Sequence, residues 1–147
     1  MSKEFELFRS LFDNSPNLAI LNINNNCDEI TQELQSIVDN SLGILTTKEL
    51  HQIQVNNFRL KDRNFEYAIV SDCLQKIQNQ DKFISEIYHS LENSAFIIIL
   101  QNKENMYIQD IIELLDINNF RAVNDIDIFE KYHLVMGKKL HMWGAGQ

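Results

Sequence analysis

Apolar runs of strand length alternate with segments of helical period along the chain, and this alternation limits the possible folds more than any other feature. Strands that alternate with helices in this way predict a βαβ architecture. The predicted strands are residues 18–23, 42–45, 53–58, 67–70, 95–100, 120–129 and 132–140. The predicted helices are residues 3–12, 29–38, 83–91 and 107–115.

The C-terminal part of the chain departs from the alternation. Its two apolar runs, residues 120–129 and 132–140, are separated only by Glu130 and Lys131, which predicts an antiparallel hairpin. Because no linker or composition shift divides the chain, we expect a single domain over residues 1–147. Within it we expect an N-terminal helix and turn (1–17), a core (18–142) and a tail (143–147).

The first predicted helix carries an aromatic stripe, in which Phe5, Phe8 and Phe12 recur at helical spacing. Such a stripe is expected to pack in the core of the domain. The alternative is a contact in a homodimer.

The charge of the chain narrows the choice of partners. The formal net charge is −8 and most basic residues are scattered singly, so we expect no nucleic acid and no acidic membrane surface as a partner. The longest strongly apolar run, residues 95–100, is far too short to cross a bilayer. With no signal peptide expected either, the prediction is a cytoplasmic protein.

The cysteines and histidines do not indicate a metal site. Cys27 and Cys73 lie far apart in the sequence and form no C-x-x-C pair, so reduced thiols are expected. The histidines lie on different predicted elements and show no ligand spacing. They are His51, His89, His133 and His141.

Three stretches resemble class I S-adenosylmethionine-dependent methyltransferases. The stretch that begins with FEYAIVSDCL, residues 65–100, is similar to the fourth strand, following helix and fifth strand of that family. GILTTKEL, residues 43–50, is similar to the second-strand pattern G-I-D-x-S-x-E-x, and LNINNNCDE, residues 21–29, follows the first motif L-D-x-G-x-G-x-G-E. The resemblance, over residues 18–140, implies a Rossmann-like methyltransferase fold. That fold has a mostly parallel seven-stranded sheet, a C-terminal antiparallel hairpin and helices on both faces.

The first motif is altered at the positions that would face the cofactor. Asn22 replaces the Asp of the motif, and its three glycines are replaced by Asn24, Asn26 and Asp28. In the family these glycines let the main chain approach the methionine part of the cofactor closely. Asparagine tolerates a left-handed backbone, so we expect the turn to survive while the added side chains fill the pocket.

Other cofactor positions are altered as well. The resemblance places Leu45 where the family has the acidic residue that accepts hydrogen bonds from both ribose hydroxyls, with Thr46 beside it. Asn56 or Asn57 matches the Asp that often contacts adenine, and Ser71 lies at the end of the fourth strand. We therefore expect a degenerate site and no bound cofactor.

A purely structural interpretation of the asparagine turn stands beside this one. Asn26 is expected to cap the following helix, with Glu29 completing a capping box. Asp28 and Glu29 would also favour the helix N-terminus electrostatically and repel an anionic group that approached it.

The corner at residues 71–73 faces the methyl group in the family, but SDCL matches none of the family's catalytic patterns there. Asp72 is the candidate base, although an Asp at a strand end is more often a turn or helix cap, and Cys73 is expected to be a buried apolar residue. No catalytic residue is assigned.

The predicted function is a catalytically inactive methyltransferase-like domain that acts as an interaction or regulatory module, as a homodimer or with a protein partner. The alternative is a small atypical methyltransferase that binds S-adenosylmethionine and uses Asp72 or a residue of a partner. A third hypothesis is the binding of another nucleotide or small metabolite at the same strand ends.

Overall fold

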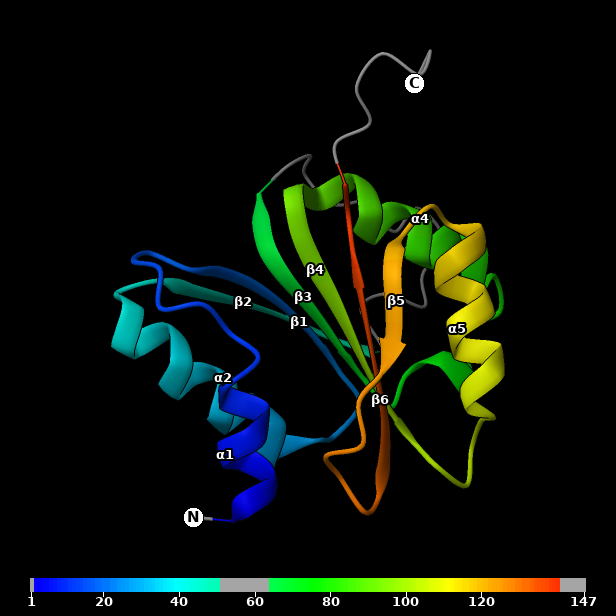
Figure 1. Ribbon diagram of the computed structural model, residues 1–147, viewed down its shortest axis with the longest axis horizontal. Helices are drawn as coiled ribbons and strands as arrows, with labels where there is room; N and C mark the ends of the chain where they lie inside the picture. The colour runs from blue at the N-terminus through cyan, green and yellow to red at the C-terminus, as the bar shows by residue number, and fades with distance from the viewer. Residues whose placement is uncertain (1, 51–63, 141–147) are drawn as a thin grey trace.

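The computed structural model describes residues 2–50 and 64–140, which form a six-stranded mixed sheet with helices on both faces (Figure 1). The strands are β1 (Ala19–Asn24), β2 (Ile44–Glu49), β3 (Phe65–Ser71), β4 (Leu91–Asn102), β5 (Arg121–Asp125) and β6 (Tyr132–Lys138). The helices are α1 (Lys3–Arg9), α2 (Asp28–Ser41), α4 (Gln80–Ser90) and α5 (Ile108–Ile117), with a short 3-10 turn η1 (Leu74–Lys76). No helix in the described ranges is long and apolar enough to cross a membrane.

The strands lie in the order β2-β1-β3-β4-β6-β5. The first four are parallel to one another, and β6 pairs antiparallel with both β4 and β5. The Rossmann-like arrangement and the C-terminal antiparallel pair are therefore confirmed. The predicted strand at residues 53–58 lies outside the described residues, and the six described strands correspond to the other six predictions.

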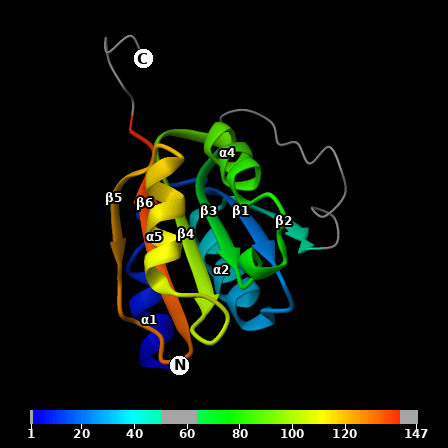
Figure 2. The ribbon, with the colours of Figure 1, turned by 90° about the vertical axis from the view of Figure 1, so that its right-hand side faces the viewer.

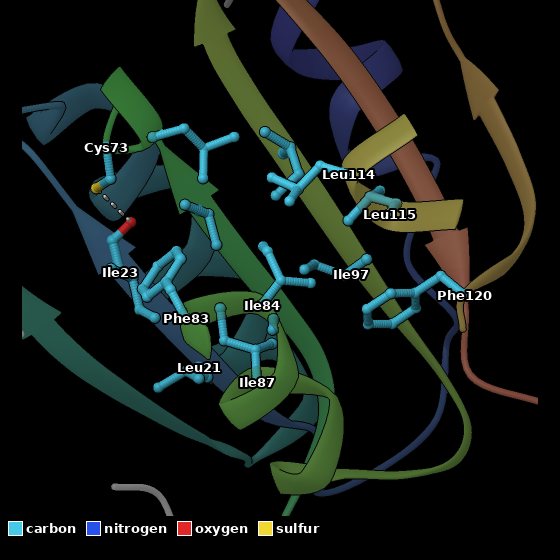
Figure 3. Packing of buried hydrophobic residues seen from close by; sticks show 14 of the residues in the cluster. Leu21, Ile23, Cys73, Phe83, Ile84, Ile87, Ile97, Leu114, Leu115 and Phe120 are labelled. Atoms are coloured by element: carbon cyan, nitrogen blue, oxygen red, sulfur yellow. Dashed lines mark hydrogen bonds between the residues drawn. The ribbon is translucent and has the colours of Figure 1, made fainter. Parts of the chain in front are cut away.

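Each face of the sheet is covered by a pair of helices, α1 and α2 on one face and α4 and α5 on the other (Figure 2). The central strands β1, β3 and β4 are covered on both faces, which is why their sequences are almost continuously apolar. Alternate residues of β1 point to opposite layers: Leu21 and Ile23 pack with α4 and α5, and Ile20 packs with α1 and α2. Figure 3 shows the first layer, where β-strand residues meet side chains of both α4 and α5.

The aromatic stripe of α1 packs inside this single domain. Phe8 is fully buried, and the ring of Phe12 lies 4.7 Å from that of Tyr67 on β3. Phe5 meets Phe129 in an edge-to-face contact with ring centroids 5.6 Å apart. The prediction that the stripe belongs to the core is confirmed.

Two strands have different bounds from those predicted. β2 begins later and continues to Glu49, because the chain before it is occupied by the end of α2: Leu42 has φ of 59° as its C-cap. At Gly43 a Cβ would lie 2.0 Å from the carbonyl oxygen of Leu18, so only glycine fits this close approach. β5 ends at Asp125, so the predicted antiparallel hairpin is present but its connection to β6 is longer than the two residues predicted. After Ile126, whose N–H still donates to the Leu134 carbonyl of β6, the chain leaves the sheet and Phe129 packs in the core beside α1.

Candidate ligand site at the carboxyl ends of the strands

The carboxyl ends of β1 and β2 meet at one edge of the sheet and border a hollow. β1 ends at Asn24 and β2 at Glu49, and these two residues are register partners. The hollow has a volume of about 360 Å³. Its described lining consists of Asn24, Asn25, Asn26, Asp28, Thr31, Thr47, Glu49, Leu50 and Lys76. In open α/β sheets, ligands bind outside the carboxyl ends of the strands, and this hollow has that position.

Asn24 closes the turn between β1 and α2 with its own side chain. Its Oδ1 accepts a hydrogen bond from the Cys27 backbone N–H at 2.6 Å, and its Nδ2 donates to the Cys27 carbonyl at 3.0 Å. The same Nδ2 lies 2.6 Å from Thr31 Oγ1 on α2. The side chain is 6% exposed, so most of its volume lies beneath the turn and against α2.

Asn26 has the left-handed backbone, φ 57°, that was expected of an asparagine in place of a glycine. It does not cap the helix as the capping-box pattern predicted. The N-cap residue of α2 is Cys27, which makes no side-chain capping bond. Asn24 satisfies the N–H of Cys27 instead, so one asparagine holds the turn and another supplies its unusual backbone angle.

Asn22 connects three elements beneath the hollow. Its fully buried side chain donates from Nδ2 to Thr31 Oγ1 at 3.0 Å and to Thr47 Oγ1 at 3.3 Å. Its Oδ1 has no hydrogen-bond partner among the described residues. The position that matches the Asp of the family motif is thus a link between β1, α2 and β2.

The structure places Leu45 and Thr46 away from the end of β2. Leu45 pairs with Ile20 near the start of both strands and packs against the apolar layer under α1 and α2. Neither Leu45 nor Thr46 lines the hollow, so the ribose position expected at Leu45 does not lie at the strand end. The reason is that β2 runs four residues further, to Glu49.

Glu49 is the residue that the sequence analysis missed. It is exposed at the last position of β2 and lines the hollow together with Asp28, while Lys76 is the basic residue of the described lining. The residues TTKE at 46–49 are all polar, so neither an apolar run nor an alternation marks the end of this strand in the sequence. The predicted adenine contact, at Asn56 or Asn57, lies outside the described residues.

The carboxyl ends of β3 and β4 form a second corner, and Asp72 is held there as a structural acceptor. Its Oδ1 receives hydrogen bonds from the Asn102 N–H at 3.2 Å, from the side-chain amides of Gln101 and Asn105 at 3.3 Å each, and from Gln75 Nε2 at 3.4 Å. Its backbone is also left-handed, with φ of 57°. A carboxylate oxygen that already accepts four donors is poorly placed to take a proton from a substrate.

The two corners are connected through the asparagine turn. Asn25 donates from its side chain to the Asp72 carbonyl at 3.1 Å, and its backbone N–H donates to the Ser71 carbonyl at 3.2 Å. Ser71 is fully buried, and its Oγ has no partner among the described residues.

Both cysteines lie near this junction, although they are far apart in the sequence. Their sulfur atoms point at the Ser71 carbonyl oxygen, Cys73 Sγ at 3.3 Å and Cys27 Sγ at 4.0 Å, and Cys73 also donates to the Ile23 carbonyl (Figure 3). Burial raises the pKa of Cys73 to about 12 and also raises the pKa of Cys27, which accepts a hydrogen bond from Tyr132 at 3.7 Å. Both thiols are therefore protonated at neutral pH, and neither is an activated nucleophile.

No group of three or more His, Cys, Asp or Glu side chains that could hold a metal ion occurs in the part of the chain that the structure describes.

Comparison with solved structures identifies the architecture. A methyltransferase from Aquifex aeolicus, described as S-adenosylmethionine-dependent, superposes with a TM-score of 0.76 over 92% of this chain and 89% of that one, at 11% sequence identity. The fold is that of the class I S-adenosylmethionine-dependent methyltransferases.

Two further structures support this assignment. An S-adenosylmethionine-dependent methyltransferase from Mesorhizobium loti matches with a TM-score of 0.63 and 9% identity, over 93% of this chain and 98% of that one. A phosphoethanolamine N-methyltransferase from Haemonchus contortus, solved with phosphomonomethylethanolamine and S-adenosylhomocysteine, matches with a TM-score of 0.69 and 11% identity. This chain aligns along 94% of its length with 52% of that enzyme. No family model and no curated protein matches the sequence. At these identities the likeness concerns the fold alone.

Proposed function

We propose that this methyltransferase-like protein binds S-adenosylmethionine or S-adenosylhomocysteine in the hollow beside β1 and β2, and that it acts as a regulatory module without catalysis of its own. The observation that carries the binding proposal is the position of Glu49. It lies at the last residue of β2, level with Asn24 at the end of β1, on the lining of the hollow.

Glu49 has the chemistry that ribose recognition needs. A carboxylate only accepts hydrogen bonds and can accept from two neighbouring hydroxyls at once. In the resembled family an acidic residue at the end of the second strand performs this task, and Glu49 occupies that place in the observed strand. Asp28 and Glu49 also favour a ligand with a positive centre, such as a sulfonium, over a purely anionic one.

The asparagine side chains leave room for a ligand. Asn24 is folded beneath its own turn, where it bonds Cys27 and Thr31. A hollow of about 360 Å³ is within the range of small-molecule sites, which span roughly 300–1,000 Å³. These two facts argue against the expectation that the turn fills the pocket.

The second corner supports the non-catalytic part of the proposal. There Asp72 accepts four hydrogen bonds on one oxygen, and the thiols of Cys27 and Cys73 are kept protonated by burial. None of these three groups is prepared to act as a base or a nucleophile.

Isothermal titration of the full chain with S-adenosylmethionine and S-adenosylhomocysteine tests the binding. We expect saturable binding, weakened about tenfold or more by Glu49→Gln, because each hydrogen bond to a charged acceptor contributes about 1.5–3 kcal/mol. Glu92→Gln, at an exposed acid on β4, is the matched control and should leave the affinity unchanged. If titration of the wild-type chain gave no saturable heat, the binding proposal would be wrong, and the protein would be a module that does not bind this ligand.

The enzyme alternative has its own measurement. The protein is incubated with methyl-labelled S-adenosylmethionine and a cell extract, and transfer of label to any component is compared with that of the Glu49→Gln variant. We expect no difference. Transfer that depends on Glu49 would make the protein a methyltransferase and overturn the regulatory part of the proposal.

A homodimer through the terminal hairpin remains part of the proposal. It is supported by the position of β5 at one outer edge of the described sheet, where its backbone could pair with a second copy. Size-exclusion chromatography with light scattering, showing a monomer at all concentrations, would remove it.

A further inference from the structure

A second groove separates the beginning of α4 from α5. It has a volume of about 780 Å³. Its described lining consists of Ile77, Gln78, Asn79, Gln80, Asp81, Met106, Asp110, Glu113, Leu114 and Ile117. Both helices lie on the same face of the sheet, and α5 is fully visible from that side in Figure 2.

One wall of the groove is a single face of α5. Asp110, Glu113, Leu114 and Ile117 recur at the i, i+3, i+4, i+7 spacing that aligns side chains along one side of a helix. Leu114 forms the floor at 7% exposure, whereas Ile117 is 66% exposed and offers a free apolar surface. The face therefore carries its acidic groups toward the N-terminus of the helix and its apolar groups toward the C-terminus.

The opposite wall comes from the segment that leads into α4. Ile77 of this segment and Met106 of the loop before α5 add partly buried apolar surface, and Asp81 at the start of α4 adds a third carboxylate. Asn118 donates to Asp81 Oδ1 at 3.2 Å and so ties the end of α5 to the start of α4. The groove thus has a fixed end, an apolar floor and acidic walls, with no basic residue among its described lining.

We propose that this groove docks a basic amphipathic helix of a partner protein. A helix in a groove is anchored by apolar side chains at i, i+3, i+4 and i+7, which suits the surface formed by Leu114, Ile117 and Met106. Lysine and arginine beside those anchors would face Asp81, Asp110 and Glu113. A second copy of this chain is a poor occupant of this groove, because none of its described helices carries a net positive charge.

The docking proposal does not depend on the ligand proposal. The groove and the hollow beside β1 and β2 share no described lining residue, so the loss of one binding activity would leave the other measurable. Glu49→Gln is accordingly expected to leave docking unchanged.

The test uses a fluorescent synthetic peptide of about 18 residues, made of leucine and lysine with leucine at helical spacing. Its fluorescence anisotropy is followed as the full chain is added, at about 0.1 M salt so that long-range attraction is screened. The variant Asp81→Asn/Asp110→Asn/Glu113→Gln removes the three groove charges. The control Asp39→Asn/Glu92→Gln/Asp125→Asn removes three exposed charges elsewhere and has the same net charge.

We expect the groove variant to weaken peptide binding about tenfold or more and the control to weaken it less than about threefold. Equal losses in the two variants, or equal binding of a scrambled peptide with the same composition, would mean non-specific attraction to an acidic protein and would overturn the proposal.

A second measurement addresses the apolar part of the groove. Ile117→Ser changes a side chain that is mostly exposed, so the fold should be kept while peptide affinity falls about three- to tenfold. Amide shift mapping of the wild-type chain by NMR should place the peptide on residues 77–81 and 106–118. Shifts confined to another face would contradict the assignment.

Discussion

The two corners at the carboxyl edge of the sheet are built from similar amide-rich turns, but one is open and the other is closed. At the end of β1 and β2, Asn24 bonds its own turn, and Glu49 remains exposed beside a hollow. At the end of β3 and β4, the carboxylate of Asp72 is the centre of the hydrogen-bond network, and it joins η1, β4 and the loop after β4.

This difference shows how an acidic residue can be present at a strand end and still be unavailable. Oδ1 of Asp72 accepts four hydrogen bonds from the protein, whereas the exposed Glu49 lies on the lining of the hollow. An acid in the expected sequence position is therefore weak evidence for a catalytic role until its hydrogen-bond partners are known.

Asp72→Ala should be the most destabilising change of this set. It would remove the side-chain acceptor of the Asn102 N–H and one of the two acceptors of the fully buried Gln101 amide, which also donates to Gln75 Oε1. It would also put alanine at φ 57°. An unsatisfied buried group costs about 1–3 kcal/mol and a left-handed alanine about 1–2 kcal/mol. We expect the free energy of unfolding, measured with urea, to fall by about 3 kcal/mol.

Asp72→Asn is the matched control. Asparagine retains an acceptor oxygen and tolerates the left-handed backbone, so at least half of the lost stability should return. A native-like stability of the alanine variant would show that the second corner is not held by this carboxylate.

Asn24→Ala should have the next largest effect, because it removes the hydrogen bonds that close the first turn. The N–H of Cys27 would lose its acceptor and Thr31 one of its donors. Loss of a side-chain cap costs about 0.5–2 kcal/mol, and we expect a fall of about 1–2 kcal/mol in unfolding free energy. Asn24→Gly restores the glycine of the family motif and should be at least as destabilising as Asn24→Ala. If the asparagine were only a tolerated replacement for glycine, Asn24→Gly would not destabilise the protein.

Alkaline pH should lower the free energy of unfolding of the protein. The folded pKa of Cys73 is raised from 9.0 to about 12 and that of Tyr67 from 10.0 to about 12, in both cases chiefly by burial. Between these values the folded state binds more protons than the unfolded state, so stability is retained below about pH 9 and falls as the pH rises toward 12. At pH 10 the contribution of Cys73 alone corresponds to a loss of about 1 kcal/mol.

Urea unfolding at pH 8 and pH 10 measures this effect, and Cys73→Ser provides the comparison. The serine variant should lose less stability than the wild type between these two pH values, because its hydroxyl does not titrate there. An identical pH dependence in both proteins would contradict the raised pKa of Cys73.

Most elements of the fold could be predicted because their patterns are long. The buried strands β1, β3 and β4 and the apolar faces of α2, α4 and α5 all occur where periodicity placed them. The errors lie at ends. β2 was predicted too short because its polar residues at 46–49 do not form an apolar run, and β5 too long because Ile126, Ile128 and Phe129 extend the run although Phe129 packs under α1.

The site was harder to predict, since it depends on register and on side-chain direction. Because β2 ends four residues later than predicted, the residue at its carboxyl end is Glu49 and not Leu45. The side chain at this position is therefore a carboxylate and not an apolar group. The direction of the Asn24 side chain beneath its turn depends on Thr31, seven residues later on α2. The donors to Asp72 come from as far as Asn105, and no local pattern could have revealed them.

Asn26→Gly should have the smallest effect and the opposite sign. Asn26 is exposed with φ of 57°, a backbone that glycine adopts without strain and asparagine at a small cost. Its neighbour Asn24 holds the turn, so removal of the Asn26 side chain should change the free energy of unfolding by less than about 0.5 kcal/mol, toward higher stability or none. Calorimetric melting of the Asn26→Gly and Asn24→Gly variants therefore measures the contribution of each asparagine to stability separately. A loss at Asn26 as large as that at Asn24 would mean that the turn is held by both side chains.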